Sequence, residues 1–60
     1  MAGYVVTNTI SQIDEYCENP SGYKGWQLRE AIQDAEVHYK HGNASKNWYE
    51  FVVRVLSRYV

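Results

Sequence analysis

The side chains of this chain that could do chemistry are two histidines, one cysteine and seven acidic residues. His38 and His41 are three residues apart, so on a helix both imidazoles could approach one metal ion. A stable site needs three or four protein ligands, and no clear third is present beyond Glu30, Asp34 or the distant Cys17. We therefore predict no metal site, and we expect both histidines to lie in solvent near the negative end of a helix dipole.

The thiol and the carboxylates also lack the setting that catalysis requires. Cys17 is expected on the apolar side of an acidic helix, which raises the pKa of a thiol and makes it inert. Acidic side chains that face water keep an ordinary pKa and are not tuned for acid–base work. We expect this of most of the set Asp14, Glu15, Glu18, Glu30, Asp34 and Glu36. No glycine-rich phosphate loop, nucleophile elbow or paired-cysteine metal motif occurs, so we predict neither enzymatic activity nor a cofactor.

Composition predicts one small globular domain over residues 1–60 in a reducing compartment. The chain is 45% hydrophobic and 22% charged, which is the balance of a folded domain, and its single cysteine excludes an intramolecular disulfide. The N-terminus has no basic leader, and no apolar run reaches the roughly 20 residues that span a bilayer. We therefore expect the cytoplasm and no membrane partner. Cores this small rarely supply more than about 3–5 kcal/mol unaided, which favours association.

Hydrophobic spacing predicts the helices that position these side chains. The first begins near Thr9, whose hydroxyl caps it while Gln12 reaches back, and it continues to about Glu18. The second covers about residues 24–40 and is closed by Gly42 in the left-handed conformation. The i, i+3, i+4, i+7, i+11 spacing predicts its buried face to be Leu28, Ala31, Ile32, Ala35 and Tyr39.

The third helix is capped by Ser45 or Asn43 and continues to Val60. Its polar residues fall within roughly 100° of the helical wheel, and the apolar remainder spans roughly 200°, about twice the stripe of a surface helix. The alternative is an α+β fold in which residues 51–60 form a strand, because that stretch is rich in β-branched and aromatic residues. We favour the all-α fold of three helices, preceded by a short extended arm at residues 4–6.

The wide apolar arc predicts self-association. We expect one side of the last helix to serve the core and the other side to contact a second copy, most simply in a two-fold dimer. The residues expected at that contact are Trp48, Phe51, Val52, Val55 and Tyr59.

A second contact stripe is predicted on the helix of residues 24–40. Trp26 and Val37 lie opposite its buried face, in line with Glu30 and Gln33. A tryptophan outside the core is typical of a surface that binds another protein. The alternative is that Trp26 precedes the helix and folds back over the core.

The competing functional hypothesis is a small helix-turn-helix DNA-binding regulator. The second helix, the turn at residues 41–44 and the last helix have the required order, and the basic residues nearby are Lys40, Lys46, Arg54 and Arg58. The net charge of −1 and the apolar last helix count against it, so we do not expect a nucleic-acid partner.

In length and aromatic content the chain resembles the small accessory proteins of phages and other mobile elements, many of which bind and inhibit a host protein. This resemblance rests on no motif and assigns no residue. Together with the two apolar surfaces, it leads us to expect a protein–protein interaction module.

Overall fold

The computed structural model describes residues 6–60, and that part of the chain contains helices and no strand. Its elements are α1 (Ile10–Glu18), the 3-10 turn η1 (Pro20–Gly22), α2 (Gly25–Lys40), α3 (Lys46–Leu56) and the 3-10 turn η2 (Ser57–Tyr59). The prediction of three helices is confirmed, and the alternative with residues 51–60 as a strand is wrong. The predicted extended arm at residues 4–6 falls outside the described residues except for Val6.

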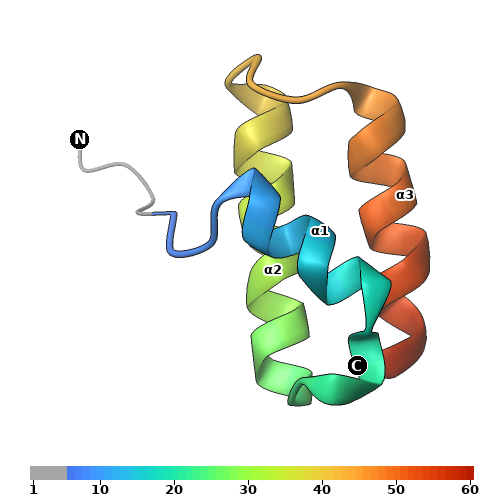
Figure 1. The fold of residues 1–60 in the computed structure, drawn as a ribbon. Helices are drawn as coiled ribbons and strands as arrows, with labels where there is room; N and C mark the ends of the chain where they lie inside the picture. Colours follow the sequence, from blue (N-terminus) through green and yellow to red (C-terminus); the bar gives the residue numbers. More distant parts are fainter. Residues whose placement is uncertain (1–5) are drawn as a thin grey trace.

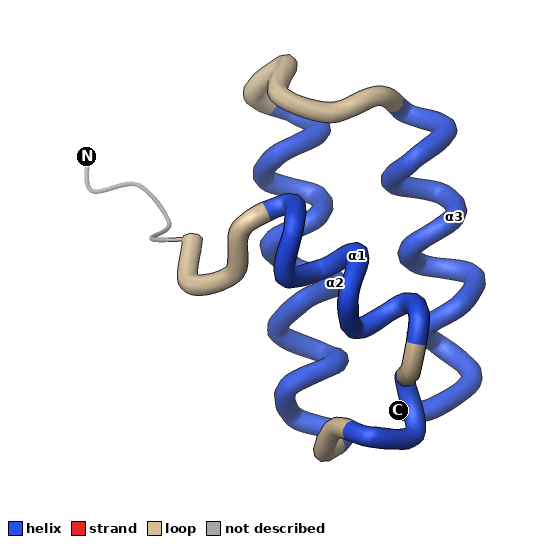
Figure 2. The backbone as a smooth tube through the Cα atoms, in the orientation of Figure 1, coloured by secondary structure: helices blue, strands red, loops and turns tan. Residues whose placement is uncertain are grey.

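The helices form a small bundle in which α2 and α3 run side by side in opposite directions and α1 packs across them (Figures 1 and 2). Local capping explains where α1 and α3 begin. The Thr9 hydroxyl accepts from the Gln12 N–H at 3.1 Å, and the Gln12 side chain accepts from the Thr9 N–H at 2.8 Å. The Ser45 hydroxyl accepts from the Trp48 N–H at 3.1 Å. The predicted Thr9 cap is confirmed, and of the two candidates for α3 the cap is Ser45, not Asn43.

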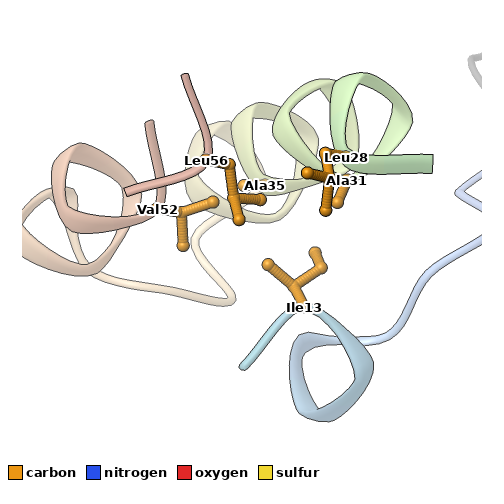
Figure 3. Close-up of a cluster of buried hydrophobic side chains, with 6 residues drawn as sticks. All are labelled: Ile13, Leu28, Ala31, Ala35, Val52 and Leu56. Atoms are coloured by element: carbon orange, nitrogen blue, oxygen red, sulfur yellow. The ribbon is translucent and has the colours of Figure 1, made fainter. Parts of the chain in front are cut away.

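All three helices contribute to one core of fully buried apolar side chains. Figure 3 shows Ile13 of α1 facing the side chains of the two longer helices. The core consists of Ile13, Leu28, Ala31, Ala35, Val52 and Leu56. Two of these six are alanines on α2, whose small side chains let the neighbouring helices approach closely. Burial of such a cluster is the main favourable term in the folding of a domain this small.

The wide apolar arc of α3 is explained by its two neighbours within the chain. Val52 and Leu56 are buried, and α3 packs against both α1 and α2. The Tyr49 ring stacks on Tyr39 of α2 with 5.2 Å between ring centroids, while Trp48 lies on the α1 side. A helix that packs on two others needs an arc about twice as wide as a helix that packs on one.

The turn between α2 and α3 depends on Gly42. Its φ is +80°, the left-handed conformation that glycine adopts without a steric penalty, and its N–H donates to the Tyr39 carbonyl at 3.1 Å. The predicted glycine closure of α2 is therefore confirmed.

Gly42→Ala should lower the free energy of unfolding by about 1 kcal/mol. Alanine is strained at a positive φ, although nothing lies within 4 Å of the added methyl group. Gly25→Ala is the matched control, since its site is equally open and lies in the first turn of α2. We expect it to leave stability unchanged or slightly raised. Urea unfolding of both variants checks this, and an equal loss from both would contradict the assignment of the penalty to φ.

Candidate interaction surfaces

The strongest polar feature of the structure is a fully buried carboxylate, Asp34. One oxygen, Oδ2, accepts from the Asn8 backbone N–H at 2.8 Å, from Asn8 Nδ2 at 2.9 Å and from the Thr7 hydroxyl at 3.1 Å. Asp34 is thus an exception to the expectation that most of the acidic side chains face water. A buried carboxylate is tolerated because hydrogen bonds replace the water that it loses.

Asn8 is the residue that completes this network. Its side-chain oxygen accepts from the Tyr16 hydroxyl at 2.9 Å, and its carbonyl lies 3.0 Å from His38 Nε2. Because a carbonyl can only accept, His38 Nε2 carries the proton in this contact. His38 is half-buried, which corrects the expectation that it lies in solvent, whereas His41 is exposed as expected. The network fastens Thr7 and Asn8 to α2, directly before the Thr9 cap at which α1 starts.

The polar groups of this network bond to one another and hold the fold together. An open depression of about 400 Å³ lies beside it, lined by residues 6–11 together with His38 and Asn43. The polar side chains of Asn8 and His38 in that lining already bond within the chain. Within residues 6–60 no group of three or more His, Cys, Asp or Glu side chains is placed to hold a metal ion.

We call the stripe predicted on the second helix the Trp26 face: Trp26, Glu30, Gln33 and Val37. Trp26 is 59% exposed, the largest exposed fraction of any large apolar side chain described. Gln33 is also exposed, and Glu30 and Val37 are half-buried. Trp26 lies inside the first turn of α2 and away from the core, so the alternative in which it folds back over the core is wrong.

The five residues predicted for self-association do not share one environment. Val52 is fully buried within one chain, so it cannot contact a partner while the helices stay packed. Trp48 and Val55 are half-buried, and only Phe51 and Tyr59 are largely exposed, at 41% and 49%. Sequence periodicity could define the arc but could not show that two neighbouring helices share it.

The basic residues of the nucleic-acid alternative likewise differ in the side chains that they contact. Lys40 pairs with Glu36 at 3.3 Å, and Lys46 lies 4.0 Å from Glu50, both one turn apart on an exposed helix surface. The Arg54 guanidinium lies 5.9 Å from the centre of the Phe51 ring. The antiparallel, side-by-side arrangement of α2 and α3 in Figure 1 also differs from the crossed pair of a helix-turn-helix motif.

Cys17 is half-buried on the inner side of α1. Burial, with a smaller contribution from the negative charge of Asp14, raises the pKa of its thiol from 9.0 to about 11. The predicted rise in pKa is confirmed. At neutral pH the thiol is therefore protonated and acts as a small apolar side chain.

No protein-family model, curated protein or solved structure matches the chain. Among the described residues, no helix has the length and apolar character needed to cross a membrane.

Asp34→Ala should lower the free energy of unfolding by about 3 kcal/mol, because it removes the acceptor of three hydrogen bonds and leaves the Asn8 N–H buried without its partner. Asp14→Ala is the control. Asp14 is exposed and accepts one bond, from Trp48 Nε1 at 2.7 Å, so its loss should cost about 1 kcal/mol or less. Urea unfolding measures both. Equal effects would contradict the anchoring role of Asp34.

The Cys17 thiol should react with a thiol reagent at pH 8 at least about tenfold more slowly in the folded chain than in urea, because only the thiolate reacts. Folding raises the pKa from 9.0 to about 11, so the unfolded thiol ionises first. The thiol's contribution to stability is therefore complete below pH 9 and is lost as the pH rises toward 11. Equal labelling rates in the two states would show that the thiol is not buried.

Proposed function

We propose that this chain is a non-enzymatic interaction module that binds another protein through the Trp26 face of α2. The observation that carries the proposal is the 59% exposure of Trp26, a side chain that the core does not use. Burying a large apolar side chain stabilises by roughly 1.5–3 kcal/mol. Because Trp26 stays exposed in the folded chain, a complex with a partner that covers it would gain this free energy. Tryptophan is also among the residues that dominate the energy of protein interfaces.

The packing of α2 against the core favours a Trp26 face that is already formed before a partner binds. The Trp26 face lies on a helix of 16 residues whose opposite side contributes Leu28, Ala31 and Ala35 to the core. A side chain on such a helix loses little further freedom on binding, which lowers the entropic cost of association. Gln33 and Glu30 supply polar groups beside the indole, as at the rim of many interfaces.

The class of partner follows from the absence of other recognition chemistry in residues 6–60. The basic side chains lie on different helices and two of them are paired with glutamates, so they form no continuous track for phosphates. A protein surface with an apolar recess for an indole is the partner that fits best. The resemblance to small mobile-element proteins supports a partner from the host cell, which this chain would bind or inhibit.

Trp26→Ala should weaken partner capture at least about tenfold, since truncating an interface tryptophan costs about 2 kcal/mol or more. Tyr59→Ala is the matched control, because Tyr59 is also an exposed aromatic residue, at 49%, but lies in η2, outside the Trp26 face. The measurement is affinity capture from source-cell lysate with each tagged variant, followed by quantitative mass spectrometry.

The expected result is one or more proteins retained by the parent chain and by Tyr59→Ala but lost with Trp26→Ala. Circular dichroism should show both variants as helical as the parent. If Trp26→Ala captures every protein that the parent captures, the Trp26 face is not the binding surface.

A further inference from the structure

A separate surface of mixed charge lies on the side of the bundle where α1 meets α3. The Trp48 indole N–H donates to Asp14 at 2.7 Å and joins the two helices. At 100° per residue, Glu18 lies about 40° around α1 from Asp14, on the side away from the buried Ile13. Phe51 lies about 60° around α3 from Trp48, on the side away from the buried Val52, and Arg58 follows in η2, just past the end of α3. These outward side chains therefore border one seam.

The charges along this seam are not neutralised within the chain. We define the α1/α3 seam as Glu15, Glu18, Phe51, Arg54 and Arg58, all of which are exposed. Among residues 6–60 the only ion pairs within 4.0 Å are Lys40 with Glu36 and Lys46 with Glu50. Neither glutamate of the seam pairs with either arginine, although they lie on neighbouring helices.

The two sides of the seam carry opposite charges at similar spacing. Glu15 and Glu18 are three residues apart on α1, about one helical turn or 5–6 Å. Arg54 lies on α3, and Arg58 follows four residues later in the 3-10 turn η2. Residues 1–23 contain no lysine or arginine, so the acidic side has no competing positive charge from its own segment. A two-fold rotation places the acidic side of one copy on the basic side of the other, twice.

We propose that a second copy of this chain docks on the α1/α3 seam, with Arg54 and Arg58 of each copy facing Glu15 and Glu18 of the other around the exposed Phe51 ring. This differs from the apolar contact that the sequence predicts, because Val52 is enclosed within the chain and only Phe51 of the exposed apolar side chains lies in the seam. A stable dimer usually buries about 800 Å² of each partner. That is about a fifth of the 4122 Å² surface of this chain.

The seam offers less apolar area than such an interface, so the association should be weak and driven by charge. We expect a dissociation constant on the order of 10–100 µM at low salt. The interaction is independent of the Trp26 face, which lies on another helix.

Sedimentation equilibrium over about 10–300 µM protein tests the proposal. We expect a monomer–dimer equilibrium at about 50 mM salt that weakens at least about fivefold at about 0.5 M, where screening is strong. Arg54→Glu with Arg58→Glu, or Glu15→Lys with Glu18→Lys, should each weaken dimerisation at least about tenfold. Mixing these two variants should restore a dimer, now between unlike chains.

Lys24→Glu with Arg29→Glu is the matched control, because it changes the net charge by the same amount on exposed residues at and near the start of α2. It should dimerise like the parent, as should Trp26→Ala, which separates this test from that of the Trp26 face. Circular dichroism verifies that every variant is folded. A monomer at all concentrations and salts would overturn the proposal, as would a dimer insensitive to salt and to both charge reversals.

Discussion

The packing of α3 against two other helices is the constraint on which the rest of the structure depends. A chain of this size has one small core, and α3 supplies two of its six fully buried side chains while contacting both α1 and α2. Its neighbours cover much of the roughly 200° apolar arc without a second copy of the chain. On α3 they leave Phe51 exposed, and on α2 the Trp26 side chain lies outside the core altogether.

The arrangement holds only if α1 is kept in place, because a helix of nine residues is not stable in isolation. Two polar contacts do this at different points. The Asn8–Asp34 bonds fasten the segment before α1 to the middle of α2, and the bond from Trp48 to Asp14 fastens α1 to α3. The apolar residue between them, Ile13, is thereby fixed in the core. Within residues 6–60 no buried side-chain nitrogen or oxygen lacks a hydrogen-bond partner, so the buried Asn8–Asp34 anchor adds specificity to a small core.

Much of the fold could be predicted because its signals are local. The Thr9 and Gln12 pair marks the start of α1, Gly42 marks the end of α2, and the apolar spacing of α2 identifies its buried side. The role of Asp34 was missed because its partner Asn8 lies 26 residues away and belongs to no periodic element. One signal was present, since Asp34 lies only about 60° on the helical wheel from the core residue Ala31, at the edge of the buried side. The enclosure of Val52 was missed for a related reason, because a single helix does not reveal how many neighbours it has.

The proposed function requires that the folded chain leave the Trp26 indole in water. The most direct test is the fluorescence of a Trp48→Phe variant, in which Trp26 is the only indole, measured in dilute solution after circular dichroism has verified the fold. The account predicts the emission of a solvent-exposed indole and acrylamide quenching close to that of the urea-unfolded chain. Blue-shifted emission that acrylamide quenches poorly in the folded monomer would show that Trp26 is covered within the chain, and it would contradict the claim.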